Sequence, residues 1–172
     1  MSLVILTNKE IEEKFEYRWP RLCLDRRFWE IPKIVNRNPY KLWNEVKFDR
    51  SNYNALGHLE GKQGIYTFVV KPRDLFTKHH TYIVYVGETQ NLNGRFKKYF
   101  SYANSNHPSD QKKRRMVLVW ADYLYFQYYE TNFSTKQERR DAEYDLIDSI
   151  VPPINDDFRS QILDAYKKAL SF

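Results

Sequence analysis

Six polar residues of this sequence stand where a folded chain could use them for chemistry. They are Tyr66, Tyr85, Arg95, Tyr99, Glu143 and Asn155. A carboxylate on a largely apolar helix face costs roughly several kcal/mol unless a cation or a donor meets it. For Glu143 that partner would be Arg95, Arg139 or a divalent ion, and only the ion would make the site a reaction centre. An ion held there, beside arginine and tyrosine, would suit the hydrolysis of an anionic ester.

A helix is predicted around Glu143, from Thr135 to Ile150. Ser134 with Gln137 three residues later is typical of a capping box, which marks the start of a helix. The inward stripe of this helix is Arg139, Glu143, Leu146, Ile147 and Ile150. Glu143 is therefore expected on the face that packs against the rest of the protein.

Two strands are expected to carry Tyr66 and Tyr85. Gln63–Val70 and Thr81–Val86 are rich in β-branched and aromatic residues, and the charged segment Lys71–His80 between them indicates a hairpin with a long loop. Alternation predicts two sets of residues that each share a face: Tyr66, Phe68 and Val70 on the first strand, and Ile83 and Tyr85 on the second. Antiparallel pairing can then set Tyr66 and Tyr85 side by side.

The period changes to that of a helix after Asn91. Leu92, Arg95, Phe96 and Tyr99 have the spacing i, i+3, i+4, i+7, which places them on one face of a helix. Leu124–Glu130 predicts a third strand, Met116–Trp120 is ambiguous in type, and Lys41–Leu56 is expected to be a loop or short helix. The expected fold is α+β, with a small central antiparallel three-stranded sheet flanked by helices.

Taken in order, these residues form a signature that resembles the GIY-YIG nuclease family. Its parts here are Gly64-Ile65-Tyr66, Tyr85-Val86-Gly87, Thr89, Leu92, Arg95, Tyr99, Glu143, Leu146-Ile147, Pro153 and Asn155. The resemblance runs from about Gln63 to Asp156. Three features depart from the usual pattern: Val86 stands for isoleucine, eighteen residues separate the two tripeptides, and Tyr99 stands where many members carry histidine.

The resemblance implies a divalent-metal-dependent endonuclease that hydrolyses DNA phosphodiester bonds. Glu143 would hold one Mg²⁺ or Mn²⁺ ion, whose remaining ligands are water and substrate. Arg95 would clamp the scissile phosphate, and Tyr66 would act as general base or position the water. Free tyrosine has a pKa near 10, so a basic Tyr66 would need a cation close by, such as Arg95 or Lys71.

The other three residues would support this chemistry. Tyr85 and Tyr99 would orient water and phosphate, and Asn155 would hydrogen-bond Tyr66 or a metal-bound water. Each residue also has a structural alternative. Tyr66 and Tyr85 can be ordinary strand residues, Asn155 can be a turn residue after Pro153, and Arg95 with Glu143 can form a plain buried ion pair.

The formal net charge of +6 favours a polyanionic partner, which the resemblance implies to be DNA. The basic residues expected to contact it are Lys71, Lys97, Lys98, Lys112, Lys113, Arg114 and Arg115. The last four form the densest charge run, and with Lys97 and Lys98 they would make a basic flank beside Arg95 and a steep salt dependence of binding. A solvated helix start is the structural alternative for the run.

The chain is expected to divide into three parts. Residues 62–157 would form the nuclease domain, residues 1–61 an N-terminal helical or irregular extension, and residues 158–172 a C-terminal helix that caps the core or joins two protomers. The extension alternates basic and aromatic residues between Arg21 and Asn38. That pattern suits either a DNA-contacting arm or packing onto the nuclease core.

Composition limits the classes of protein to which the chain can belong. A chain of 172 residues with 42% hydrophobic and 29% charged residues is typical of a globular protein, and no apolar run is long enough to span a bilayer. The single cysteine, Cys23, fits a reducing cytoplasm. A free-standing restriction-type enzyme, as a homodimer on a symmetric site, is favoured over a phage-borne, homing or repair-type nicking enzyme. A catalytically silent DNA-binding module and a protein-interaction domain are the alternatives from other classes.

Overall fold

The structure is a computed structural model that describes residues 43–71, 81–159 and 161. The predictions for the N-terminal extension before Trp43, for Cys23, for most of the loop after Lys71 and for the C-terminal helix lie outside these residues. Within the described ranges, no helix is both long and apolar enough to cross a membrane.

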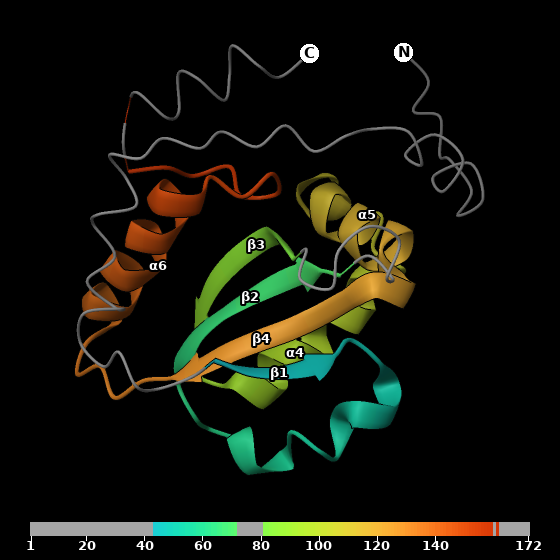
Figure 1. Cartoon of the computed structure of the whole chain (residues 1–172), viewed down its shortest axis with the longest axis horizontal. Helices are drawn as coiled ribbons and strands as arrows, with labels where there is room; N and C mark the ends of the chain where they lie inside the picture. The colour runs from blue at the N-terminus through green and yellow to red at the C-terminus, as the bar shows by residue number, and fades with distance from the viewer. Residues whose placement is uncertain (1–42, 72–80, 160, 162–172) are drawn as a thin grey trace.

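The centre of the fold is an antiparallel sheet of four strands (Figure 1). In spatial order these are β1 (Asn44–Lys47), β4 (Leu124–Glu130), β2 (Gly64–Val70) and β3 (Tyr82–Thr89). The prediction of three strands was wrong by one, because β1 lies where a loop or short helix was expected. This edge strand has four residues, of which only Val46 is apolar, so it is too short to show an alternating pattern. It forms by pairing with β4 along its whole length.

Helices cover both faces of the sheet. On one face lie α4 (Leu92–Tyr102) and α5 (Gln111–Val119), and on the other lies α6 (Lys136–Ile150), which stands beside β3 in Figure 1. The segment that the sequence left ambiguous is therefore mostly helix α5. Short 3-10 helices complete the described chain: η1 (Arg50–Tyr53), η2 (Gly57–Leu59), η3 (Pro108–Asp110) and η4 (Ala121–Tyr123).

Side-chain caps fix the starts of the two helices that carry the candidate site. Asn91 caps α4 by accepting a hydrogen bond from the Gly94 N–H at 2.9 Å, as the change of period after Asn91 predicted. The capping box of α6 lies one residue later than predicted. Thr135 accepts from the Glu138 N–H at 3.1 Å, and the Glu138 carboxylate accepts from the Ser134 N–H at 2.8 Å.

A β-bulge on β3 corrects one prediction about its faces. Tyr85 pairs with Phe68 and Ile83 pairs with Val69, so Val84 is the extra residue. As a result Ile83 packs with the α6 side of the sheet, whereas Tyr85 packs with the α4 side. The two were expected to share a face, but the inserted residue breaks the alternation between them.

Candidate active site

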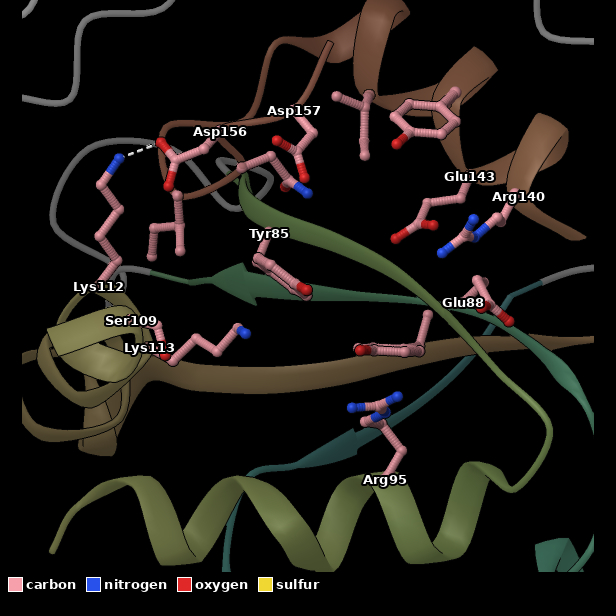
Figure 2. A pocket seen from close by; sticks show the side chains of 15 residues that line it. Tyr85, Glu88, Arg95, Ser109, Lys112, Lys113, Arg140, Glu143, Asp156 and Asp157 are labelled. Carbon is pink, nitrogen blue, oxygen red and sulfur yellow. Dashed lines mark hydrogen bonds and ion pairs between the residues drawn. The ribbon is translucent and has the colours of Figure 1, made fainter. Parts of the chain in front are cut away.

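A cleft of about 300 Å³ opens at the β3 edge of the sheet, between α5 and α6 (Figure 2). Five of the six predicted site residues line it: Tyr66, Tyr85, Arg95, Glu143 and Asn155. The sixth, Tyr99, lies behind Tyr66 and hydrogen-bonds it, with 3.1 Å between the two hydroxyl oxygens. Residues from β2, β3, α4, α6 and the loop after α6 therefore meet at one place.

The three tyrosines form a cluster around the buried Tyr66 ring. Its centroid lies 6.1 Å from that of Tyr85 and 6.0 Å from that of Tyr99. Burial raises the pKa of Tyr66 and of Tyr99 well above the ordinary tyrosine value, and it raises the pKa of Tyr85 as well. All three hydroxyls are therefore protonated at neutral pH, when they can both donate and accept hydrogen bonds.

The glycine of the second tripeptide makes room for Tyr66. Gly87 pairs directly with Tyr66 across the two strands. A Cβ atom at Gly87 would lie 2.3 Å from the Tyr66 hydroxyl oxygen and 2.4 Å from the ring carbon that carries it. Glycine is needed here because the ring lies against the backbone of the neighbouring strand.

Arg95 enters the cleft from α4, below Tyr85 in Figure 2. Burial opposes the charge of its guanidinium, but the surrounding tyrosine oxygens outweigh this effect and leave the pKa of Arg95 above its ordinary value. No carboxylate among residues 43–71 and 81–159 forms an ion pair with it. The structural alternative of a buried Arg95–Glu143 ion pair is therefore not what the structure shows.

Glu143 reaches the cleft from α6 and lies above Arg95 in Figure 2. Burial, with the nearby charge of Glu88, raises the pKa of Glu143 to about 7, although the Glu88 backbone N–H donates a hydrogen bond to it. Arg139, one candidate for its partner, instead binds the Glu88 carboxylate, with 3.0 Å between Nε and Oε2. Within the described part of the chain, Glu143 therefore has no ion-pair partner.

These properties fit a divalent cation. The Glu143 carboxylate is partly buried, borders an open cleft and forms no ion pair with a described residue, although the charges of Arg140 and Arg95 act to lower its pKa. No group of three or more His, Cys, Asp or Glu side chains with metal-binding geometry occurs among the described residues. A cation at Glu143 would therefore take one protein carboxylate and complete its shell with water and substrate oxygens, as Mg²⁺ commonly does.

Asn155 has a different set of partners from the one expected. Its side-chain oxygen accepts from the Val86 N–H at 2.9 Å, and its amide nitrogen donates to the Val86 carbonyl at 2.9 Å. The preceding Ile154 N–H bonds the Val84 carbonyl at 3.1 Å. The loop after α6 thus pairs with the open edge of β3, and Asn155 fixes the strand that carries Tyr85.

Replacing Asn155 by alanine is expected to lower the free energy of unfolding by about 2 kcal/mol, because two buried backbone groups of Val86 lose their partners. Urea unfolding of the full chain measures the loss. Asn132→Ala is the matched control, since Asn132 is exposed and should change stability by less than about 0.5 kcal/mol. Equal stability of the two variants would contradict the assigned role.

The predicted basic residues differ in their surroundings. Only Lys112 and Lys113 line the cleft. Lys71 pairs with Glu45 of β1, with 2.5 Å between Nζ and Oε1, so the structure does not support it as the cation beside Tyr66. Lys97 lies over the Tyr53 ring, 5.9 Å from its centroid, away from the cleft.

The remaining basic residues do not line the cleft. Lys98 and Arg115 are exposed, and Arg114 donates from Nε to the Ala103 carbonyl at 3.3 Å. Sequence reasoning grouped these residues by their closeness along the chain, whereas successive residues of a helix point in different directions. DNA contact by Lys71, Lys97, Lys98, Arg114 and Arg115 stays a prediction.

Several residues of the cleft were missed: Glu88, Ser109, Arg140, Tyr144, Asp156 and Asp157. Glu88 follows Gly87, and Arg140 lies three residues before Glu143, on the same face of α6. The i, i+3 spacing to Glu143 was a usable signal for Arg140. Nothing local marked Glu88, because its position depends on the ion pair with Arg139 from a distant part of the chain.

Comparisons with known proteins agree with the motif. Residues 62–152 match the model of the GIY-YIG catalytic domain, and this span is more than half of the 172-residue chain. No curated protein matches. Four solved structures of point mutants of the GIY-YIG N-terminal endonuclease domain of UvrC from Thermotoga maritima are similar, at 17–18% identity and a TM-score of 0.36. The first two each cover 62% of this chain and 97% of their own. By the match over residues 62–152, the chain belongs to the GIY-YIG family of endonucleases.

Proposed function

We propose that this chain hydrolyses DNA phosphodiester bonds in the cleft, with the help of Mg²⁺ or Mn²⁺ held by Glu143. One observation carries the proposal. Arg95 and Glu143 face the same cleft from helices on opposite faces of the sheet, yet they do not pair with each other. A cation for phosphate and an anion for metal are thus both available, as phosphoryl chemistry requires.

Each residue has a distinct task in this proposal. Arg95 binds the scissile phosphate and stabilises the charge that develops on its oxygens. The hydroxyls of Tyr66, Tyr85 and Tyr99 orient the attacking water and the phosphate. The cation, when bound, would polarise the phosphate and neutralise the leaving oxygen. Asn155 holds the β3 backbone that presents Tyr85.

Of the two roles considered for Tyr66, positioning of water has the better support. A general base works best with a pKa near the working pH, and burial moves the pKa of Tyr66 away from it. Its hydroxyl already bonds Tyr99, so the oxygen is held in place. Tyr66 would therefore accept a hydrogen bond from water without first losing its own proton.

A cleavage assay tests the proposal. Supercoiled and long linear DNA are incubated with the full chain in Mg²⁺, in Mn²⁺ or in EDTA, beside Arg95→Ala. We expect cleavage that needs the metal and that falls by at least about 100-fold in the variant. DNA that is bound but left uncut under every metal condition would overturn the hydrolytic function and favour a silent binding module.

The form of the products decides the type of enzyme. We infer a restriction-type enzyme, which would give discrete linear fragments and would act on a symmetric site as a homodimer. Nicked circles or smears would instead favour a phage-borne, homing or repair-type nicking enzyme. Sedimentation of the protein with and without DNA measures the oligomeric state separately.

An ion pair at the mouth of the cleft should weaken DNA binding. Lys112 of α5 pairs with Asp156 of the loop after α6, and both side chains are about half exposed. Asp156→Asn removes a negative charge and frees Lys112, so DNA affinity at low salt should rise about two- to fivefold. Stability should change by less than about 0.5 kcal/mol, because exposed ion pairs contribute little.

Fluorescence anisotropy with labelled duplex DNA measures this gain. Asp122→Asn is the matched control, since Asp122 is exposed in η4 and does not line the cleft. The same gain in both variants would mean that total charge is responsible, and would contradict the specific role of Asp156.

A further inference from the structure

We propose that Arg140 binds a second phosphate of the substrate strand, adjacent to the scissile one, on the side of the cleft opposite Lys113. The strand would then cross the β3 edge from α5 to α6, with Arg95 and Glu143 between the two outer cations. The inference rests on the proposed function, because it assumes that the cleft receives nucleic acid.

The position of Arg140 is the first argument. It lies one helical turn before Glu143 and lines the same cleft. Figure 2 shows its guanidinium beside Glu143, while Lys112 and Lys113 approach from α5 at the far side of Tyr85. The two sides of the cleft thus each carry positive charge, and the floor carries Arg95.

Availability is the second argument. Arg140 is exposed, and it forms no ion pair or hydrogen bond with any residue in the ranges 43–71 and 81–159. Its neighbour Arg139 is buried, binds Glu88 at 3.0 Å and binds Gln63 at 2.9 Å. The adjacent arginines therefore have separate tasks: Arg139 is committed to the structure, and Arg140 is free to bind a ligand.

The opposite side offers a comparable cation. Lys113 Nζ lies over the Tyr102 ring, 5.3 Å from its centroid, and forms no ion pair with the described carboxylates. Lys112 is paired with Asp156. Lys113 and Arg140 are therefore the two outer cations of the cleft that form no ion pair within the described chain, although the charge of Arg140 also acts on Glu143. A flexible polyanion that spans the cleft would neutralise both of them.

The guanidinium also suits this ligand better than an ammonium would. Arginine presents a planar set of donors that can bind two phosphate oxygens at once. An alternative task for Arg140 is to neutralise Glu143, because its positive charge acts to lower the pKa of that carboxyl. The two tasks differ in what they predict, because only phosphate binding changes the salt dependence of DNA affinity.

The test compares wild type with Arg140→Gln and with the control Lys136→Gln. Lys136 is exposed, lies one turn before Arg140 on α6 and does not line the cleft. Affinity for a labelled 30-base-pair duplex is measured by anisotropy in EDTA, over a series of salt concentrations. The plot of log affinity against log salt concentration has a negative slope. For Arg140→Gln this slope should be shallower than that of the wild type by about 0.9, which corresponds to the loss of one phosphate contact.

Lys136→Gln should keep the wild-type slope, and thermal unfolding should show that all three proteins are folded. An unchanged slope in Arg140→Gln, or an equal fall in the control, would overturn the inference. Because EDTA prevents hydrolysis, this binding result does not depend on whether the wild type cuts DNA. A protein that binds with the expected slopes but never cuts DNA would refute the proposed function alone.

A substrate with a mapped cleavage position tests the direction of the strand. Single methylphosphonates, which remove the charge of one phosphate, are placed on either side of the scissile bond. At one of these positions the methylphosphonate should slow cleavage by the wild type severalfold. The same methylphosphonate should not slow cleavage by Arg140→Gln any further, relative to the unmodified substrate. The other should behave in the same way with Lys113→Gln. If both variants respond like the wild type at every position, neither side chain contacts a flanking phosphate.

Discussion

Glu143→Gln is expected to abolish metal-dependent cleavage of DNA and, at the same time, to make the metal-free protein more stable at pH 8. The first effect follows from the loss of the carboxylate that would hold the cation. A reduction of at least about 1000-fold is expected, since the cation would stabilise the charge that develops on the phosphate and on the leaving oxygen. The second effect follows from the cost of keeping an ionised carboxylate in this site.

The sign of the stability change comes from the raised pKa. Folding moves the pKa of Glu143 from 4.5 to about 7, so the folded protein binds more protons than the unfolded chain between these values. The contribution of the protonated Glu143 carboxyl to the stability of the fold is therefore lost as the pH rises from 4.5 through about 7. Glutamine carries no charge to bury, and its side-chain oxygen can still accept from the Glu88 N–H. We expect a gain of about 2 kcal/mol at pH 8 in EDTA.

Urea unfolding at two pH values measures this gain. Near pH 5 the wild-type carboxyl is mostly protonated in the folded state, so the two proteins should have similar stability there. At pH 8 the variant should be the more stable one. A variant that is less stable at both pH values would mean that Glu143 stabilises the fold, and it would remove the argument that the carboxylate waits for a cation.

Gly87→Ala is expected to reduce both stability and cleavage by displacing Tyr66. The added Cβ would come within 3 Å of three atoms of the Tyr66 side chain. The ring cannot easily move away, because it stacks on Phe126 at 5.3 Å between centroids and its hydroxyl bonds Tyr99. The free energy of unfolding should fall by about 1–3 kcal/mol, and the cleavage rate by about 100-fold.

Two comparisons isolate the cause. Gly57→Ala is the control, because a Cβ at Gly57 meets nothing within 4 Å, and its stability should change by less than about 0.5 kcal/mol. In a Tyr66→Ala background, Gly87→Ala should cost much less than it does in the wild type, since the clashing ring is absent. An equal cost in both backgrounds would show that the clash with Tyr66 is not responsible.

Local sequence patterns were sufficient to predict three of the strands and the two helices that carry Arg95 and Glu143. Each of these elements has a clear period and, for the helices, a capping residue near the start. They also placed Tyr66, Arg95 and Glu143 on faces that could meet. That these faces meet at one site was predicted from the resemblance to the GIY-YIG family and not from the local patterns.

Features that depend on long-range pairing could not be predicted. Strand β1 exists because β4 offers it a partner, and its own four residues carry almost no signal. The bulge at Val84 depends on how β3 pairs with β2. Asn155 was predicted to hydrogen-bond Tyr66 or a metal-bound water, or to be a turn residue. Its amide instead completes the edge of β3, which only the folded structure can show.

The location of the bound cation tests the central claim most directly. Crystals of the full chain, soaked in MnCl₂ at pH 8, would be measured at a wavelength where manganese scatters anomalously. We predict an anomalous peak in direct contact with the Glu143 carboxylate, inside the cleft that also contains Arg95, and no such peak in Glu143→Gln crystals. A peak that stays in the variant, or one that lies only outside the cleft, would contradict the assignment of Glu143 as the metal ligand.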